Sequence, residues 1–265
     1  MGIALDIDTP EGWHAALAAL DWQLDLGVEA VVGDAPVSAY DLPERVERAV
    51  ARPPVAAAQA EVPAAAVDPV AVSQAAASAA RTLDDLREAL AAYPHCELKK
   101  GARNTVFADG TPAARVLILG EAPGREEDLE GRPFVGRAGQ LLDRMFRAIG
   151  MGRERPDPAT ALYIFNVMPW RPPQNRDPEP EEVAMMLPFV QRHIELADPE
   201  VIVLMGNTPL FAATGSKGIL RRRGTWITAF GRPALPMTHP AYLLRNPAAK
   251  REAWADLLSL QARLR

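Results

Sequence analysis

A single cysteine, Cys96, is present among the 265 residues, so the chain cannot form an internal disulfide. The sequence also lacks any run of about 18 apolar residues, which argues against a membrane-spanning helix. Its first residues include Asp6 and Asp8 and no basic cluster, unlike a secretory signal. We therefore expect a cytoplasmic protein that has no membrane partner.

The chain has no excess of positive charge, because 34 Asp and Glu residues outnumber 29 Lys and Arg residues and give a formal net charge of -5. This balance argues against a protein that coats nucleic acid through a uniformly basic surface. A nucleic-acid site needs only a local basic face, which the net charge leaves open. The run Arg221-Arg222-Arg223 is such a cluster, although three consecutive arginines are more often a solvated turn.

The N-terminal region, residues 1–50, has the pattern of a small helical segment. Thr9 followed by Pro10 is typical of a helix start. Apolar side chains then recur at helical spacing, at Trp13, Leu17, Leu20 and Leu24. This segment is either an amphipathic helix that lies on the main domain or a docking peptide for another protein.

Residues 51–80 consist mainly of alanine, proline and valine and have almost no large apolar side chains. Such a segment cannot bury enough surface to offset the entropy lost on ordering, so we expect a disordered linker. An alternative interpretation of its last residues, 75–80, is that they begin the next helix. A single folded domain is then expected over residues 81–265.

Within residues 81–265, predicted strands alternate with predicted helices. Apolar runs of strand length occupy residues 115–119, 162–167 and 201–205, and shorter runs occupy 225–228 and 234–237. Segments with helical periodicity lie before, between and after them. This alternation indicates a mainly parallel sheet with helices on both faces. The sequence therefore predicts a three-layer α/β/α fold around a central, mainly parallel four-stranded sheet.

Three of these predicted strands end in residues that are suited to chemistry. The first is followed by the turn Gly120-Glu121-Ala122-Pro123-Gly124, and then by Gly131-Arg132-Pro133-Phe134-Val135-Gly136. The second ends at Asn166, and the last leads into His239, which precedes a proline. Ligands of open α/β sheets bind at the carboxyl ends of the strands. We therefore expect the functional site where these three segments meet.

Together these segments resemble the uracil-DNA glycosylase superfamily, and most closely its family 4, the bacterial and archaeal iron–sulfur type. The resemblance covers residues 93–265 and includes Arg-Pro-Pro-Gln-Asn-Arg (171–176) and His-Pro-Ala-Tyr-Leu-Leu-Arg (239–245). It implies a monofunctional DNA-repair hydrolase that flips uracil out of single- or double-stranded DNA and hydrolyses its N-glycosidic bond. The abasic site that remains would start base-excision repair. The alternative is a superfamily member that binds or cross-links uracil or another damaged base without releasing it.

The resemblance also implies roles in a pocket for a flipped base. Phe134 would stack on the base, and the amide of Asn166 would contact the O4/N3 edge of uracil. His239 would donate a hydrogen bond to O2 as negative charge develops there. Core packing, loop bracing and a structural histidine are the respective alternatives for these three residues.

The resemblance leaves two candidates for the catalytic carboxylate. Related families place Asp or Asn near the position of Ala122, so Ala122 contributes only to the uracil-binding wall. Glu121 and Glu127 are then the catalytic candidates, to orient water or to stabilise the cationic sugar. Glu127 has two alternatives: it shapes the pocket around C5 of the base, or it belongs to a solvated charge run.

Residues near the C-terminus resemble the intercalation loop of the superfamily. Leu243 and Leu244 would fill the gap left by the flipped base, and Arg245 and Arg222 would contact DNA phosphates. A buried Leu-Leu pair that opens a helix is the alternative for the two leucines. A DNA substrate further implies a location at the nucleoid.

The sequence departs from this family at its iron–sulfur cluster, which four cysteines hold. Cys96 matches one of these positions, and Tyr93, Trp170 and Met186 occupy the other three. Because four thiolates normally hold such a cluster, we expect no cluster and no other cofactor. We expect the three large side chains to hold the same loops by packing. We also expect a monomer whose N-terminal segment can bind a repair or replication protein.

Overall fold

The computed structural model describes residues 67–265 without a gap, together with Thr9, Trp13, His14, Ala16 and Leu17. The last four of these are helical, and the backbone N–H of Trp13 donates to the carbonyl oxygen of Thr9 at 2.9 Å. The Trp13 and Leu17 side chains are exposed. The rest of the predicted N-terminal segment, and the predicted linker as far as residue 66, lie outside the described residues.

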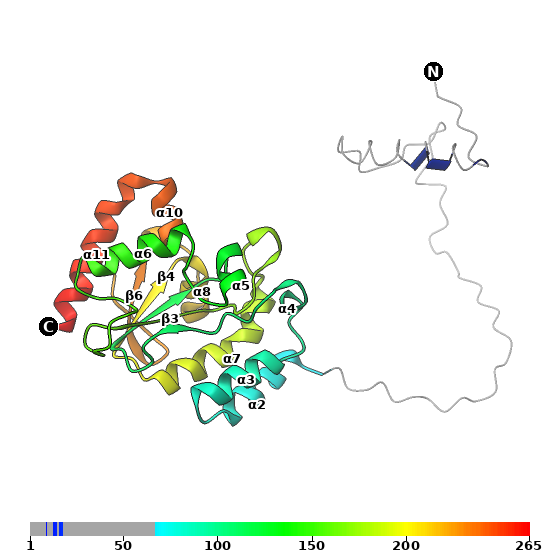
Figure 1. Ribbon diagram of the computed structural model, residues 1–265, viewed down its shortest axis with the longest axis horizontal. Coiled ribbons are helices and arrows are strands. Elements are labelled where there is room, and N and C mark those ends of the chain that lie inside the picture. Colours follow the sequence, from blue (N-terminus) through cyan, green and yellow to red (C-terminus); the bar gives the residue numbers. More distant parts are fainter. Residues whose placement is uncertain (1–8, 10–12, 15, 18–66) are drawn as a thin grey trace, which may run out of the picture. The chain divides into compact units, whose positions relative to one another are not determined.

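The centre of the domain is a six-stranded sheet in the order β1-β3-β2-β4-β6-β5 (Figure 1). The four inner strands are parallel to one another. The bounds of the strands are β1 Asp109–Gly110, β2 Val116–Gly120, β3 Leu162–Asn166, β4 Val201–Met205, β5 Ile227–Ala229 and β6 Arg232–Met237. The predicted α/β class and its parallel four-stranded centre are confirmed. The difference is that a short antiparallel strand, β1 or β5, extends each edge.

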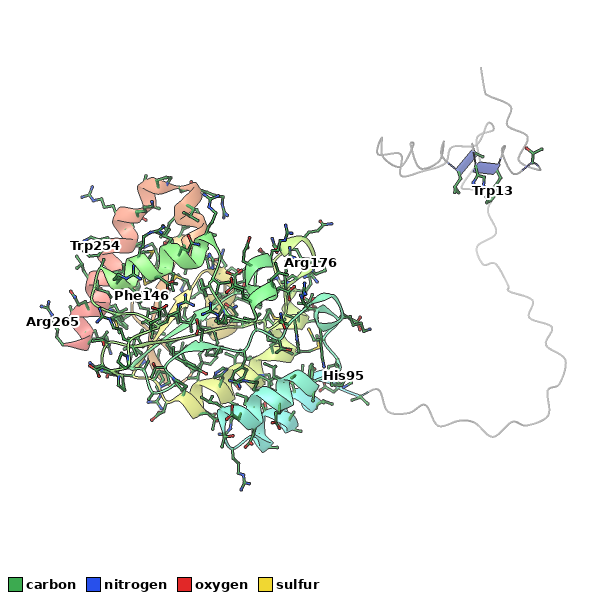
Figure 2. The ribbon with its side chains drawn as sticks, in the orientation of Figure 1. Trp13, His95, Phe146, Arg176, Trp254 and Arg265 are labelled. Carbon is green, nitrogen blue, oxygen red and sulfur yellow. The ribbon has the colours of Figure 1, made fainter. Side chains whose placement is uncertain are left out.

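Helices cover both faces of the sheet, which is why every residue of β2, β3 and β4 is buried. Leu117 and Leu119 face the same core as α2 (Pro69–Ala79), α3 (Leu83–Ala92) and α7 (Pro180–Ala197). Val116 and Ile118 face the other core, with Phe146 of α6 (Arg137–Arg147) and Leu257 of α11 (Lys250–Leu264). Figure 2 shows Phe146 inside the molecule and Trp254 of α11 at its surface. The remaining helices are α4 (Leu98–Gly101), α5 (Arg125–Glu130), η1 (Pro173–Asn175), α8 (Asn207–Thr214), α9 (Ile219–Arg222), α10 (Pro240–Arg245) and η2 (Pro247–Ala249).

Helix α2 corrects the predicted linker, which was expected to continue to residue 80. The Asp68 side chain caps this helix by accepting from the N–H of Val70 at 2.9 Å. Its side chains Ser73 and Ala77 are buried where it packs on α7. Two nitrogens of Arg192 in α7 also donate to the carbonyl oxygen of Ala80, each at 2.9 Å. Small alanine side chains let α2 approach α7 closely, so a composition that suggested a linker forms a packed helix.

No helix among residues 67–265 combines the length and apolar character that a membrane crossing requires.

Candidate active site

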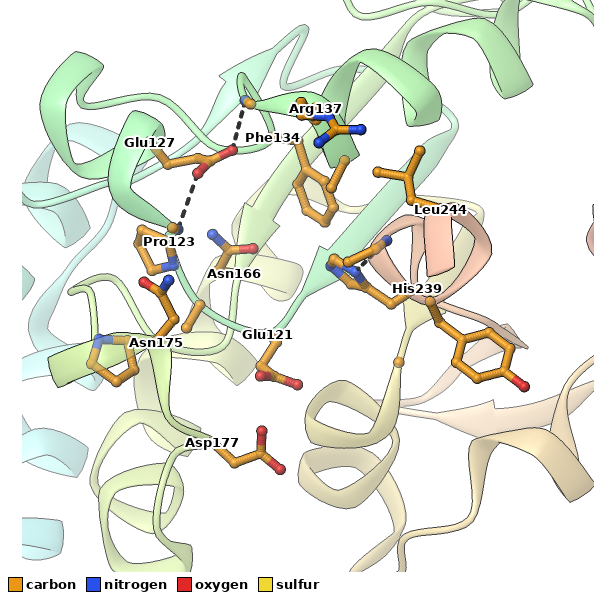
Figure 3. Close-up of a pocket in the computed structure, with 18 of the residues that line it drawn as sticks. Glu121, Pro123, Glu127, Phe134, Arg137, Asn166, Asn175, Asp177, His239 and Leu244 are labelled. Atoms are coloured by element: carbon orange, nitrogen blue, oxygen red, sulfur yellow. Dashed lines mark hydrogen bonds between the residues drawn. The ribbon is translucent and has the colours of Figure 1, made fainter. Parts of the chain in front are cut away.

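A cavity of about 1080 Å³ lies at the carboxyl ends of β2, β3 and β6 (Figure 3). Its volume is at the upper end of the roughly 300–1,000 Å³ that small-molecule pockets usually have, which leaves room for a ligand that extends beyond one ring. The structure brings most of the predicted site residues to this cavity. They are Glu121, Ala122, Glu127, Phe134, Asn166, His239, Leu244 and Arg245. Leu243 and Arg222 are not among its lining residues.

The absence of a side chain at Gly120 lets two lining residues converge. A Cβ at Gly120 would lie 2.2 Å from Oδ1 of Asn166 and 2.5 Å from Cε2 of Phe134, and real Cβ atoms do not approach other atoms so closely. Gly120 ends β2 and pairs with Asn166 at the end of β3. The parallel register therefore places the Asn166 amide beside Gly120, and the ring of Phe134 reaches the same place from the segment between α5 and α6.

Two buried side-chain polar atoms in the described part of the chain have no hydrogen-bond partner, and both belong to residues that line the cavity. They are Oδ1 of Asn166 and Oγ1 of Thr238. Leaving a buried acceptor unpaired costs about 1–3 kcal/mol. Asn166 is 6% exposed, so bulk water does not compensate for this cost. A ligand with a polar edge would supply the missing partner.

His239 offers a hydrogen-bond donor to the cavity. Its Nδ1 accepts the backbone N–H of Ala241 at 3.1 Å, which assigns the ring proton of the neutral form to Nε2. Burial, and to a smaller extent the positive charge of Arg245, lowers the pKa of His239 to about 4. The imidazole is therefore neutral near pH 7. Its ring centre lies 5.4 Å from that of Phe134, with the ring planes 30° apart.

Both carboxylate oxygens of Glu127 accept hydrogen bonds from the backbone. One oxygen accepts the N–H of Gly124 at 3.1 Å, and the other accepts the N–H groups of Val135 and Gly136, each at 2.9 Å. The residue is 8% exposed. These three bonds tie the turn after β2 to the Phe134 segment, and they favour the pocket-shaping alternative for Glu127 over a direct catalytic role.

Glu121 is the carboxylate whose surroundings suit chemistry. It lines the cavity beside Asp177, and its Oε2 accepts from the Thr208 hydroxyl at 2.8 Å (Figure 3). Burial raises the pKa of Glu121, and the negative charge of Asp177 adds to this rise. Perturbed carboxylates in a cavity are candidates for general-base or electrostatic roles. Ala122 lies next to it in the cavity wall and brings no polar side chain.

The two adjacent leucines of α10 have different surroundings, which corrects the predicted pair of intercalating side chains. Leu243 is 0% exposed and packs with Leu141 and Ala253, so it belongs to the core. Leu244 is half-buried and lines the cavity. Successive residues of a helix point about 100° apart, so one leucine anchors α10 while the next faces the cavity.

The arginine run also divides by role. Arg223 pairs with Asp256 and so joins α9 to α11. Arg222 is half-buried, its Nη1 lies 3.4 Å from the Thr214 hydroxyl, and it does not line the cavity. Its predicted DNA contact remains a prediction for the outer surface.

Several lining residues escaped the sequence-based prediction. Leu220 of α9 is 56% exposed at the cavity, although it lies in none of the segments that resemble the family and only precedes the arginine run. Other polar lining residues are contributed by helix starts and the proline-rich loop. They include Arg125, Arg137, Arg171, Asn175, Arg176, Asp177 and Asn207. The start of a helix after a glycine, as at Gly136 and Gly206, was the signal that could have indicated Arg137 and Asn207.

The four positions that correspond to the family's cluster cysteines are buried in one hydrophobic core, which includes Tyr93, Cys96, Trp170 and Met186. The Tyr93 hydroxyl donates to the carbonyl oxygen of Pro69 at 2.7 Å, and Nε1 of Trp170 donates to the Thr105 hydroxyl at 3.0 Å. Over the described ranges, no group of three or more His, Cys, Asp or Glu side chains is arranged to hold a metal ion. Tyrosine, tryptophan and methionine supply no thiolate, so the residues at these positions do not fit a cluster that four cysteines hold.

Comparison with known proteins gives a consistent family. The family model for the uracil DNA glycosylase superfamily matches residues 107–258. The chain is 44% identical over 154 residues to a Type-4 uracil-DNA glycosylase of Thermotoga maritima, a match that covers 57% of this chain and 77% of the relative. The Type-4 uracil-DNA glycosylase of Archaeoglobus fulgidus is 36% identical over 189 residues, which cover 66% of this chain and 89% of the relative. That of Sulfurisphaera tokodaii is 36% identical over 175 residues, with 63% and 77% covered.

Proposed function

Because this chain belongs to the uracil-DNA glycosylase superfamily, we propose that it excises uracil from DNA, hydrolysing the N-glycosidic bond and leaving an abasic site. The observation that carries the proposal is the meeting of three groups in one cavity. An unpaired buried amide, an aromatic ring and a neutral imidazole converge at Asn166, Phe134 and His239. Each group matches one part of a flipped uracil nucleotide: its polar edge, its face and its O2 atom.

Recognition of the base follows from the donors and acceptors at the cavity. The amide oxygen of Asn166 accepts from N3–H of uracil, and its NH₂ group donates to O4. Phe134 supplies the stacking face for the extruded ring. Such a site discriminates strongly, because a base with the wrong edge leaves the buried amide unpaired.

Bond cleavage places negative charge on the departing uracil and positive charge on the sugar. The neutral His239 donates its Nε2–H to O2, and this hydrogen bond strengthens as the charge on O2 grows. With a pKa of about 4, His239 acts at neutral pH by donating a hydrogen bond, without being an imidazolium acid. Glu121 then orients the attacking water or stabilises the cationic sugar, since Glu127 is committed to the backbone.

The role of Glu121 predicts a specific pH dependence. The carboxylate is the active form, and its pKa is raised above the ordinary value of 4.5. Uracil release should therefore increase with pH through that raised pKa and level off above it. Glu121→Gln should lower the rate by about 10²-fold and abolish this acid limb, because an amide does not titrate. Single-turnover rates from pH 4.5 to 8 measure both effects. An unchanged acid limb in Glu121→Gln would contradict the assignment.

The two leucines of α10 allow a matched pair of substitutions. Leu243→Ala should reduce the free energy of unfolding by about 2–5 kcal/mol, because it leaves a cavity in a fully buried cluster. Leu244→Ala should change stability little and lower excision from duplex DNA by about tenfold, because the gap left by the flipped base loses its filling. Excision from single-stranded DNA should change less in Leu244→Ala. Chemical denaturation and rates on both substrates test this, and equal effects of the two substitutions would contradict it.

The direct test of the function uses oligonucleotides with one uracil, single-stranded and paired, followed by alkali. We expect strand cleavage at the uracil position with the wild-type chain. No strand cleavage at the uracil position with either the wild type or His239→Ala would refute the proposal. A protein–DNA adduct stable in a denaturing gel, with no released base, would instead indicate the cross-linking member of the superfamily.

We further propose that the chain works without an iron–sulfur cluster, with packing of Tyr93, Trp170 and Met186 holding the loops. A single cysteine in the whole chain supports this, since such a cluster normally takes four thiolates. Purified protein should contain neither stoichiometric iron nor acid-labile sulfide, and a chelator should leave its melting temperature unchanged. Iron at cluster stoichiometry would overturn this part of the proposal.

The remaining proposals concern partners and location. The chain acts as a monomer at the nucleoid in the cytoplasm, and residues 1–50 bind a repair or replication protein. Because α2 packs on α7, a deletion that tests this should stop at residue 66. It should leave excision intact and weaken partner capture, and loss of excision would show that the segment belongs to the catalytic fold. Sedimentation and a fluorescent fusion test the monomer and the location.

A further inference from the structure

We infer that Arg153, which lies outside the cavity, is a positioning residue for the base-stacking ring of Phe134. This inference rests on the proposed function, since it concerns how the stacking face is held. Arg153 follows α6 and has a side chain that is only 7% exposed. No motif in the sequence singles it out.

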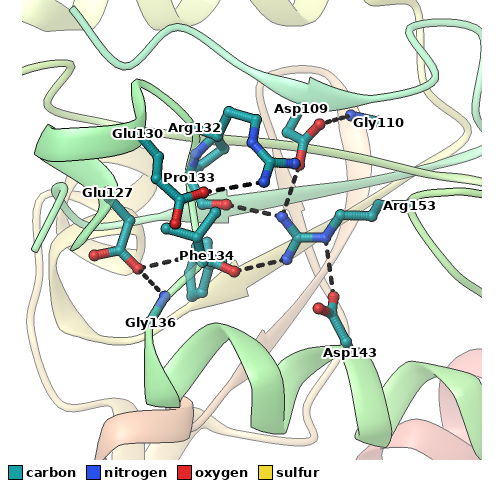
Figure 4. A network of polar contacts seen from close by, with 11 residues as sticks. Asp109, Gly110, Glu127, Glu130, Arg132, Pro133, Phe134, Gly136, Asp143 and Arg153 are labelled. Atoms are coloured by element: carbon teal, nitrogen blue, oxygen red, sulfur yellow. Dashed lines mark hydrogen bonds and ion pairs between the residues drawn. The ribbon is translucent and has the colours of Figure 1, made fainter. Parts of the chain in front are cut away.

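The guanidinium of Arg153 binds the backbone on which Phe134 sits (Figure 4). Its Nη1 donates to the carbonyl oxygen of Pro133 at 2.8 Å, and its Nη2 donates to the carbonyl oxygen of Phe134 at 2.9 Å. Two neighbouring carbonyl groups are thus fixed by one planar group. Rotation of either of these two peptide groups would break its hydrogen bond to Arg153.

Two carboxylates fix the guanidinium in turn. Nε of Arg153 donates to Oδ1 of Asp143 in α6, and Nη1 donates to Oδ2 of Asp109 in β1, both at 2.9 Å. The buried cation is therefore neutralised from two elements of the fold. Its orientation is defined by four oxygen atoms in total, a geometry that the planar arginine fork provides and a lysine ammonium does not.

The Phe134 segment needs such support because its conformation is unfavourable for its residue type. Phe134 has a φ of 54°, in the left-handed region that aromatic residues rarely adopt. Its carbonyl group is also pressed against α6, where a Cβ at Gly139 would lie 1.7 Å from the oxygen. Conformations of this kind persist only where surrounding contacts hold them.

Arg153 and Glu127 hold this segment through different backbone groups, Arg153 through carbonyl oxygens and Glu127 through N–H groups. The cation binds the carbonyl oxygens of Pro133 and Phe134, and the anion of Glu127 binds the next two N–H groups, those of Val135 and Gly136. Figure 4 shows both charged side chains around the Phe134 turn. The ring between them is thereby fixed against His239 and above Gly120.

Loss of Arg153 should therefore impair binding and release of the uracil base and leave binding of the DNA backbone unchanged. Arg153→Met should lower the single-turnover rate of uracil release by about 10²-fold, the effect expected of a displacement of about 1 Å in a catalytic arrangement. It should also weaken inhibition by free uracil by about tenfold, because stacking on Phe134 is impaired. Arg153→Lys should fall between Arg153→Met and the wild type. Binding of an otherwise identical oligonucleotide with thymine should stay within about twofold.

Controls separate this role from a loss of folding. Arg115→Met removes an arginine that also makes two bonds to a carboxylate, that of Glu200, but does not line the cavity, and it should leave both readouts unchanged. Active-site titration corrects for unfolded protein. If Arg153→Met fails to fold, Asp143→Asn and Arg153→Lys provide the same two readouts with milder changes.

A double-mutant cycle decides whether the effect acts through the ring. In a Phe134→Ala background, Arg153→Lys should have little further effect on release or on inhibition by uracil. An undiminished effect there, or wild-type rates and inhibition in Arg153→Lys and Arg153→Met, would overturn the inference while leaving the proposed function intact. A wild-type protein that releases no uracil would overturn both.

Discussion

His239→Ala lowers the single-turnover rate of uracil release by an expected factor of about 10²–10³. The imidazole Nε2–H is the donor that the cavity directs at the developing charge on O2, and alanine offers none. The loss should appear in the rate at saturating DNA, with little change in the DNA concentration that gives half saturation. Binding in the ground state does not depend on charge that forms only in the transition state.

The matched control for this substitution is His95→Ala. His95 is half-buried beside Tyr93, at a ring-centre distance of 5.5 Å, and does not line the cavity. It should retain the wild-type rate within about twofold. The wild-type rate should also show no step between pH 6 and 8 from His239, because a pKa of about 4 keeps the His239 imidazole neutral there. A step near pH 6.5 that disappears in His239→Ala would contradict the neutral-donor role.

Asn166→Leu is expected to abolish activity and to stabilise the protein at the same time. Leucine has a similar shape but no polar edge, so uracil should lose both contacts and the rate should fall by at least about 10³-fold. The folded protein loses a buried oxygen that has no partner, so the free energy of unfolding should rise by about 1–3 kcal/mol. Rates of base release and chemical denaturation measure the two effects.

Opposite signs for stability and activity are the distinguishing result for Asn166. If Asn166 only braced the loop, removing its amide would lower the stability of the protein, as removing a capping residue does. Thr238→Val serves as a comparison, because Oγ1 of Thr238 is the other buried side-chain polar atom without a partner in residues 67–265. A loss of stability in Asn166→Leu larger than about 1 kcal/mol would contradict the recognition role.

The position of the site could be predicted from the sequence because it depends on topology. Apolar runs ending at Gly120 and Asn166 had to be parallel strands, and parallel strands bring their ends together. The helix over residues 83–92 likewise depends on its local sequence, because Thr82 and Asp85 form a capping box at its start. These features depend on local sequence and on simple rules of connection.

Other features depend on contacts between distant segments and could not be predicted. Helix α2 is stable because its alanines fit against α7, and composition alone does not report that fit. The two roles of Leu243 and Leu244 depend on the rotation of a six-residue helix. In the sequence, Glu127 lies within a run of acidic residues, which is typical of a solvated surface. Only the fold shows that its carboxylate accepts three backbone N–H groups.

The two outer strands of the sheet have a consequence for behaviour at high concentration. An exposed sheet edge is a template on which a second chain can add a strand, and long flat edges lead to aggregation. Here β1 spans two residues and β5 spans three, so each edge presents very few free backbone groups. Both are antiparallel to their neighbours and end the parallel array. The sheet is thereby protected against edge-to-edge growth, so a concentrated stock should stay free of fibrils.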